Sequence, residues 1–235
     1  MDKEAFYQES EKVCSLYLLA PALHEEGVHV ISTDEKTGIQ AKERARPTLP
    51  MKPKRVEYQE FEYKRHGTCC LIGNFEVATG KVIAPTLSLT RTEEDFKTHI
   101  EQTFAQDPQG EWVFVVDQLN THKSEALVRW VADVCDIKQD LGEKGKSGIL
   151  KSMQTRADFL MDEAHRVRFV YTPKHASWLN QIECWFSILV RRLLKRGSFT
   201  SVQDLQQSLL DFIDFFNKTM AKPFKWTYTG RPLNL

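Results

Sequence analysis

The stretch from Glu111 to His122, with the sequence EWVFVVDQLNTH, constrains the fold of this chain more than any other. Its apolar residues, Trp112 to Val116, have no helical period, are rich in β-branched and aromatic types, and precede turn formers. This pattern predicts a strand buried on both faces of a sheet. Asp117 ends that strand, where open α/β sheets bind their ligands. Asp117 is therefore a candidate site residue, although a helix cap or turn residue is the more common role of such an acid.

The order of the other predicted elements defines a fold class. Val28 to Ile31 predicts a first strand running into Asp34, which lies at or near its end in a turn helped by Gly38. The further predicted strands are 67–77, 81–89 and 168–171, and the predicted helices are 4–20, 92–104, 124–135, 177–196 and one opening at 200 or 201. Three consecutive strands followed by alternating helices and strands predict an α/β, RNase H-like fold, with a mixed five-stranded sheet flanked by helices on both faces.

The charge of the chain balances overall, with 32 basic and 32 acidic residues, but it is sorted along the sequence. Residues 1–35 carry a net charge of −6 (2 − 8), residues 36–66 carry +5 (9 − 4) and residues 164–200 carry +6 (7 − 1). The Gly- and Lys-rich segment 138–165 reads as a mobile basic insertion before the last strand. Basic patches are typical of surfaces that bind a phosphate backbone, although solvated faces can also have this composition.

Cysteine usage and the N-terminus indicate the compartment. The five cysteines are odd in number and lack C-x-x-C spacing, which argues against a disulfide framework and a structural zinc site. The first residues, MDKEAFYQESEK, are acidic where a signal peptide would be basic, and no stretch is long and apolar enough to span a bilayer. We therefore expect a soluble cytoplasmic protein with no membrane association.

Three carboxylates are expected to meet in this fold. An RNase H-like sheet pairs the first and fourth strands, which would bring Asp34 beside Asp117 although 83 positions separate them (117 − 34). Glu183 lies at the margin of the buried stripe of the helix 177–196, from which it could reach the sheet edge. Each acid alone is more simply a turn or surface residue. Together, without a basic partner, they predict a site for Mg²⁺ or Mn²⁺.

Four segments carry a resemblance to a known family. They are DEKTGIQ (34–40), EFEYKRHGT (60–68), VVDQLNTH (115–122) and YTPKHASWLNQIECWFSIL (171–189). They resemble the DDE transposases of bacterial insertion sequences in the mariner superfamily. The resemblance implies a nuclease and strand transferase with Asp34, Asp117 and Glu183 as its catalytic triad. Its partners would be transposon ends and target DNA, and its location the bacterial cytoplasm with the nucleoid.

The chain departs from that family in two places. The interval from Asp117 to Glu183 is longer than usual, and the excess falls in the insertion 138–165. Family members carry helix-turn-helix DNA-binding domains ahead of the catalytic domain, whereas 33 residues precede Asp34 here. We expect an N-terminal helix and linker remnant (1–26), an RNase H-like DDE catalytic domain (27–220) and a C-terminal tail (221–235), with a possible separate helix-turn-helix segment and a homodimer in the DNA complex.

The hypothesis that follows is two-metal phosphoryl transfer on DNA, with Asp34 bridging two ions and Asp117 and Glu183 each anchoring one. Asn120, His122 and Asn180 are auxiliary candidates, although Asn120 and His122 could equally be turn caps. Trp178 and Trp185 are expected in the core. The candidate DNA contacts are Arg46, Lys52, Lys54, Arg55, Lys144, Lys146, Lys174, His175, Arg191, Arg192, Lys195 and Arg196. Two alternatives stay open: an inert, truncated transposase-derived DNA-binding module, and a host nuclease of RNase H or resolvase type.

Overall fold

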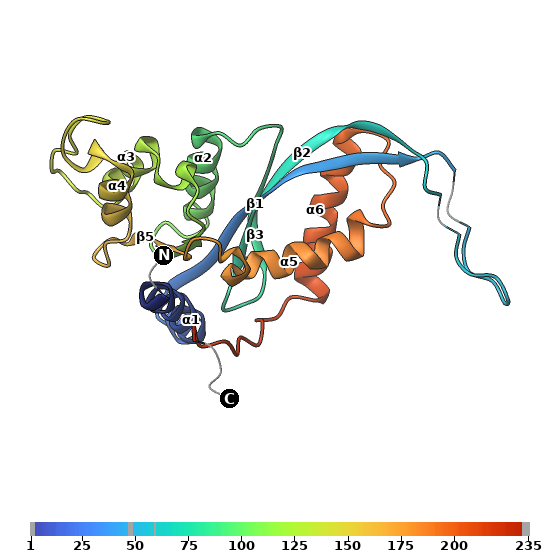
Figure 1. The fold of residues 1–235 in the computed structure, drawn as a ribbon, viewed down its shortest axis with the longest axis horizontal. Coiled ribbons are helices and arrows are strands. Elements are labelled where there is room, and N and C mark those ends of the chain that lie inside the picture. The colour runs from blue at the N-terminus through green and yellow to red at the C-terminus, as the bar shows by residue number, and fades with distance from the viewer. Residues whose placement is uncertain (1–2, 47–48, 59, 232–235) are drawn as a thin grey trace.

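A computed structural model describes residues 3–46, 49–58 and 60–231, which form a mixed sheet flanked by helices (Figure 1). The strands are β1 (Val28–Arg44), β2 (Tyr63–Glu76), β3 (Val82–Ser88), β4 (Glu111–Val116) and β5 (Val167–Tyr171). The α-helices are α1 (Lys3–Glu25), α2 (Glu93–Phe104), α3 (Glu125–Val134), α4 (Met153–Leu160), α5 (Gln181–Leu189) and α6 (Val202–Thr219). Short 3₁₀ turns are η1 (Asn120–Lys123), η2 (Ile149–Lys151) and η3 (Ser177–Leu179), and η4 (Val190–Leu194) is a π-helical turn. The outermost positions of the predicted N-terminal segment and C-terminal tail, 1–2 and 232–235, lie outside the described residues.

The sheet has the strand order β3-β2-β1-β4-β5. β1 and β3 pair antiparallel with β2, whereas β4 pairs parallel with both β1 and β5. The three-strand meander followed by two parallel strands, each reached through helices, confirms the predicted RNase H-like arrangement.

The two faces of the sheet bury different sets of helices, as Figure 1 shows. On one face, Ile31, Ile72 and Phe114 pack in a core with α2, α3 and α4. On the other face, Leu71 and Phe75 pack against α5 and α6. On the same face, apolar residues from the start of β1 and from β4 pack against α1. Because side chains alternate between the two faces along a strand, successive residues of β1 pack into the cores on opposite faces of the sheet.

The first strand is much longer than the sequence pattern indicated, and Asp34 lies inside it instead of at its end. Gly38, expected in a turn, has φ +64° and falls where the β1–β2 register shifts between Lys36 and Ile39. A glycine in this conformation accommodates a β-bulge, so the strand bends and continues where a turn was predicted. Past Ala41, which is still buried in the core beside α6, the ends of β1 and β2 form an arm that projects from the body of the molecule (Figure 1).

Two predicted helix boundaries were wrong. α1 continues past Pro21, which is exposed and leaves the last turn of the helix intact. The helix predicted over 177–196 is divided into η3, α5 and η4. Because the chain does not enter α5 until Gln181, Trp178 leaves the apolar stripe and is 51% exposed, whereas Trp185 is fully buried as expected.

The segment 138–165 is part of the core and not a detached mobile insertion. Leu150 and Leu160 are fully buried and join the core on the α2–α4 face of the sheet. The apolar residues of η2 and α4 outweigh the surrounding glycines and lysines, because burying them against α3 and β5 removes their surface from water. None of the helices that the structure describes is both long and apolar enough to cross a membrane.

Candidate active site

The pairing of β1 with β4 brings Asp34 and Asp117 to neighbouring positions. The parallel ladder runs from Val28 opposite Glu111 to Ser32 opposite Val115, with a constant offset of 83 residues. Continuing the same offset by two residues places Asp34 opposite Asp117. Val113 and Val115 of β4 face α1, so alternation directs Asp117 toward that face as well.

The start of α5 is fastened to β1 beside Asp34, and this sets the position of Glu183. Asn180, fully buried, donates from Nδ2 to the carbonyl of Thr33 (2.8 Å) and accepts a hydrogen bond from the hydroxyl of Ser32. The Ser32 hydroxyl in turn accepts the backbone N–H of Ile182 (2.8 Å). The predicted auxiliary residue Asn180 is thus a positioning residue that holds the first turn of α5, including Glu183, against the strand that carries Asp34.

A glycine in the neighbouring strand allows this close packing. Gly73 pairs with Asp34 across the β1–β2 ladder and therefore lies on the same face of the sheet. A Cβ at Gly73 would meet side-chain atoms of Ile182 and Phe186 at 3.3 Å, tighter than most carbon contacts. The missing side chain leaves room for α5 beside Asp34.

The surroundings of Asp34 disfavour the ionised form of its carboxyl group. Burial is the main cause that raises the pKa of Asp34, against an opposing hydrogen bond from the backbone N–H of Glu35 (2.8 Å). The negative charges of Asp117, Glu35 and Glu183 raise this pKa further, so both other predicted site carboxylates are close enough to interact with Asp34. A cation bound here would relieve that repulsion.

A buried chain of hydrogen bonds holds Asp117. Of its members, His122 was predicted from the sequence and Glu35 was not. Nδ1 of His122 lies 2.9 Å from Oδ1 of Asp117, and Nε2 of His122 lies 3.1 Å from Oε1 of Glu35. His122 and Glu35 are 0% and 3% exposed. Burial alone would lower the pKa of His122, but the hydrogen bonds and charges of the two carboxylates raise it to about 9. His122 is therefore an imidazolium at neutral pH.

That imidazolium and the backbone N–H of Leu119 also affect the carboxyl of Asp117. Burial raises the pKa of Asp117, but the hydrogen bonds from His122 and Leu119 and the positive charge of His122 outweigh it and lower the pKa. Asp117 is thus ionised and oriented, whereas Asp34 beside it is hard to ionise. Glu35 was not singled out in the sequence, because only the fold shows that it faces His122, 87 positions away.

The three carboxylates do not form a compact single-ion site. Among the residues that the structure describes, Asp34, Asp117 and Glu183 do not form a set whose ligand atoms all lie within 4.8 Å of one another. One ion with ligand bonds of about 2.1 Å could not touch all three oxygens in this arrangement. Two ions about 3.5 to 4 Å apart relax that requirement, because Asp117 and Glu183 need not bind the same one. The all-oxygen donor set and the strained Asp34 fit Mg²⁺ or Mn²⁺.

Comparison with known families agrees with this arrangement. The profile of the DDE superfamily endonucleases matches residues 29–206, which includes all three carboxylates. The chain belongs to the DDE endonuclease superfamily. This confirms the DDE superfamily indicated by the four sequence segments, whereas an origin in bacterial insertion sequences stays a prediction.

Among solved structures, this chain is similar to chains of the Mos1 transposase. The Mos1 paired-end complex with the left transposon end is 10% identical with a TM-score of 0.48, and the pre-cleavage Mos1 transpososome is 9% identical with the same score. Each comparison covers 91% of this chain and 56% of the Mos1 chain, so the chain spans little more than half of that length. No curated protein matches the sequence.

Cationic side chains lie next to Glu183 of the DDE endonuclease. Lys36, Glu183 and Arg191 line one pocket of about 350 Å³ together with Phe186, Ser187 and Val190. Lys36 of β1 was not among the predicted DNA contacts, because its position beside α5 depends on the pairing of distant segments. A phosphate group in this pocket would meet two positive charges next to a candidate metal ligand.

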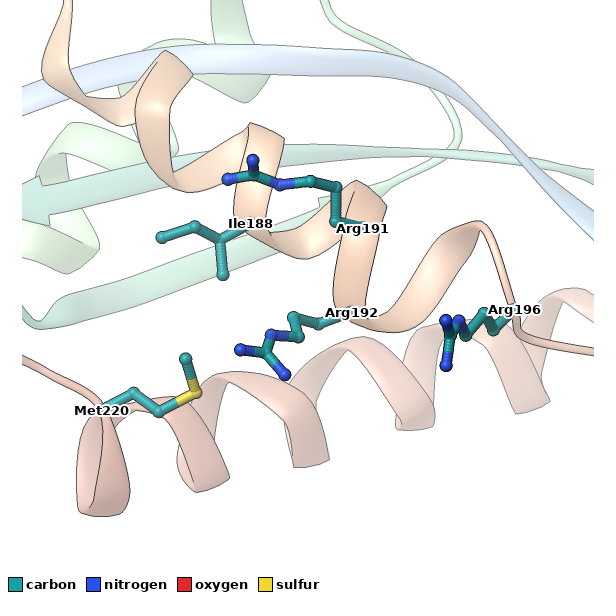
Figure 2. Close-up of a pocket in the computed structure, with 5 residues that line it drawn as sticks. All are labelled: Ile188, Arg191, Arg192, Arg196 and Met220. Atoms are coloured by element: carbon teal, nitrogen blue, oxygen red, sulfur yellow. The ribbon is translucent and has the colours of Figure 1, made fainter.

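A second group of cations continues along the same helix. Figure 2 shows Arg191 and Arg192 of η4 and Arg196 just after it, around a pocket of about 640 Å³ that is also lined by Met220, the residue that follows α6. The three arginines are exposed, and within the described part of the chain none has a carboxylate at ion-pair distance. Lys195, also exposed, lies between them in sequence. Unpaired guanidinium groups with free donors suit phosphate binding.

The predicted contacts Lys174 and His175 lie on the other side of Asp117. They line a pocket of about 700 Å³ with Gln118 and Lys123. Burial and the charge of Lys174 lower the pKa of Lys123, which shows that positive charges gather here. Cationic side chains therefore line one pocket that includes Glu183 and another that includes Gln118, the residue after Asp117.

The remaining predicted residues lie away from the carboxylates. Arg46, Lys52, Lys54 and Arg55 are exposed on the arm, where the backbone of Lys52 and Arg55 closes the tip. Lys146 pairs with Glu143 (2.7 Å) and Lys144 lies 3.9 Å from Glu93. Asn120 is exposed at the start of η1, and no contact within the described residues joins it to a carboxylate.

Proposed function

We propose that this chain is the catalytic part of a transposase, a divalent-metal-dependent DNA endonuclease and strand transferase that cuts transposon ends and joins the 3′-OH to target DNA. The observation that carries the proposal is the electrostatic coupling of Asp34 with Asp117 and Glu183 at one edge of an RNase H-like sheet. Membership of the DDE endonuclease superfamily supports a nuclease, and the cationic pockets beside Glu183 and beside Gln118 support a DNA substrate.

Asp34, Asp117 and Glu183 would hold the metal through their carboxylate oxygens, and we propose two Mg²⁺ or Mn²⁺ ions. When bound, such ions lower the pKa of an attacking water and stabilise the charge on the leaving 3′ oxygen. The ions would also offset the repulsion that raises the pKa of Asp34.

The other residues of the chain bind and orient. Lys36 and Arg191 would hold a phosphate on the Glu183 side of the scissile bond, and Lys174 would hold one on the Asp117 side. His122 fixes the Asp117 carboxylate through Nδ1 and is itself fixed by Glu35 through Nε2. Holding the reacting groups in place lowers the entropic cost of the in-line displacement.

We further propose that the chain acts as a homodimer on DNA, with a separate helix-turn-helix segment recognising the transposon ends. The arm supports the dimer. It exposes large apolar side chains far from the core, including Met51 (74%), Val56 (84%) and Phe61 (75%), beside the basic residues at its tip. Exposed apolar clusters of this kind are typical of contact surfaces.

The deciding experiment is a cleavage assay with the full chain and Mg²⁺ or Mn²⁺. Duplex DNA that carries the sequences flanking the gene is compared with an RNA·DNA hybrid, and products are scored for nicks and for joined strands. Asp117→Asn should abolish both products without changing the fold. Asp211→Asn, an exposed acid on α6, is the matched control and should leave both unchanged.

Two outcomes would contradict the proposal. DNA binding with cleavage of neither substrate would indicate an inert DNA-binding module. Cleavage restricted to the hybrid would indicate a host nuclease of the RNase H type.

A further inference from the structure

A second group of metal-ligating side chains lies at the other end of β1 from the carboxylates. His24 is in the last turn of α1, His29 is the second residue of β1, and Glu76 is the last residue of β2. His29 precedes Asp34 by five residues, which corresponds to about 17 Å along an extended strand. The group is therefore separate from the candidate active site.

The three residues present their ligand atoms to one point. Oε1 of Glu76 lies 2.8 Å from Nδ1 of His29 and 3.9 Å from Nδ1 of His24, and all three atoms lie within 4.8 Å of one another. Adjacent ligands of a tetrahedral zinc ion with bonds of about 2.05 Å are roughly 3.3 Å apart. The two distances to Glu76 lie on either side of that value, so small side-chain rotations would complete the ligand set.

An ordinary ion pair explains His29 but not His24. His29 lies between Glu76 and Asp107, as a salt-bridged histidine would. Nδ1 of His24, however, is buried and has no hydrogen-bond partner among the described residues, although the His24 side chain as a whole is 37% exposed. Buried polar atoms are normally paired, and a lone ring nitrogen directed at a carboxylate is suited to a cation between them.

The surrounding residues orient the ligands as in known zinc sites. Nε2 of His29 faces Oδ2 of Asp107 (3.3 Å), and the hydroxyl of Thr79 donates to Oε2 of Glu76 (2.5 Å). Ligating histidines commonly use their second nitrogen in this way, which sets the tautomer and leaves the first nitrogen free for the metal. The His29 ring is also stacked on Trp112, with centroids 4.2 Å apart.

We propose that His24, His29 and Glu76 form a zinc-binding site that joins the end of α1 to β1 and β2. Two imidazoles and one carboxylate suit Zn²⁺ better than Mg²⁺, and the exposed side of His24 leaves access for water as a fourth ligand. The cysteine spacing argued against a structural zinc site, but this site uses no cysteine. It does not depend on the proposed nuclease function.

The test is a calorimetric titration of the full chain with Zn²⁺ in excess Mg²⁺. The melting temperature is measured with and without zinc. Wild type should bind one equivalent and melt at a higher temperature with zinc. Asp107→Asn should weaken binding about 10- to 100-fold, and His24→Ala and Glu76→Gln should weaken it more. His66→Ala is the matched control, because His66 also pairs with a glutamate, Glu43 (2.7 Å), but among the described residues this pair belongs to no group of three ligands.

The double variant Asp34→Asn, Asp117→Asn distinguishes this site from the candidate active site. Zinc binding should be unchanged in that variant. Loss of zinc binding in that double variant, or unchanged binding in His24→Ala, would overturn the proposal. The visible spectrum of the Co²⁺-loaded chain provides a readout that does not depend on stability. Nitrogen and oxygen coordination that changes in His24→Ala supports the site, whereas sulfur charge-transfer bands would assign the metal to a cysteine instead.

Discussion

The raised pKa of Asp34 predicts an unusual dependence of stability on pH in metal-free protein. A carboxyl group with a pKa of 3.8 in the unfolded chain and about 7 in the folded chain favours folding in its protonated form. Both states are protonated below pH 4. Between pH 4 and 7 the folded state retains a proton that the unfolded state has released, so stability falls as pH rises. Above pH 7 Asp34 is ionised in both states, and its full destabilising effect on the folded state is present.

The structure sets the size of the effect. A pKa rise from 3.8 to about 7 corresponds to about 4 kcal/mol. Because Asp34 is only 7% exposed, little of this is lost to solvent screening. Asp34→Asn keeps the shape and the acceptor for the Glu35 N–H but cannot ionise. The variant should match wild type near pH 4 and exceed it by up to about 4 kcal/mol at pH 8, or on the order of 10 °C in melting temperature.

The assay is urea unfolding in EDTA from pH 4 to 8, followed by the fluorescence of the buried tryptophans Trp112 and Trp185. Asp117→Asn is the control with the opposite sign, since the pKa of Asp117 is lowered and its ionised form stabilises the fold. Mg²⁺ at pH 8 should stabilise wild type and have much less effect on Asp34→Asn. A difference between wild type and Asp34→Asn that stays constant across this pH range would refute the reasoning, as would equal stabilisation of both by Mg²⁺.

Three further predictions concern the groups around the carboxylates. His122→Ala should slow DNA nicking about 10- to 100-fold with little change in the affinity for DNA. Because folding raises the pKa of His122 from 6.5 to about 9, its ion pairs stabilise wild type fully below pH 6.5, and this contribution should disappear as pH rises through 9. Asn180→Ala should lower the free energy of unfolding by about 1 to 3 kcal/mol, because it removes the acceptor of the Ser32 O–H and the side-chain donor to the Thr33 carbonyl; an unchanged urea midpoint would contradict the positioning role. Arg191→Ala and Arg196→Ala should each reduce the slope of log affinity for DNA against log salt by about 0.9, whereas Lys218→Ala, which is paired with Asp214, should leave the slope unchanged.

The local elements of the fold could be predicted because their signals lie within a few residues of one another. The capping box at Thr92 and Asp95 marks the start of α2, and Ser201 caps α6 as expected. The apolar run before Asp117 is β4, and Gly80 closes the β2–β3 turn with φ +70°. Patterning with a period of two or 3.6 residues reports which side chains are buried, and that is enough to order the strands and helices.

Boundaries failed where tertiary contacts outweighed local preference. Gly38 resembles a turn residue in sequence, but pairing with β2 on one side makes it a bulge within a long strand. The glycines and lysines of 138–165 suggested a mobile segment, but Leu150 and Leu160 bind it to the core. In each case the sequence window was too short to contain the partner that decided the conformation.

The sequence by itself determined which acids could form a site, since Asp34, Asp117 and Glu183 follow from their positions on predicted elements and from the family resemblance. Only the tertiary structure decided what surrounds them. His122 meets Glu35 across 87 positions, Asn180 meets Ser32 across 148, and His29 meets Glu76 across 47. Such contacts are set by strand register and helix docking, which depend on the packing of the whole chain and leave no periodic trace near either residue.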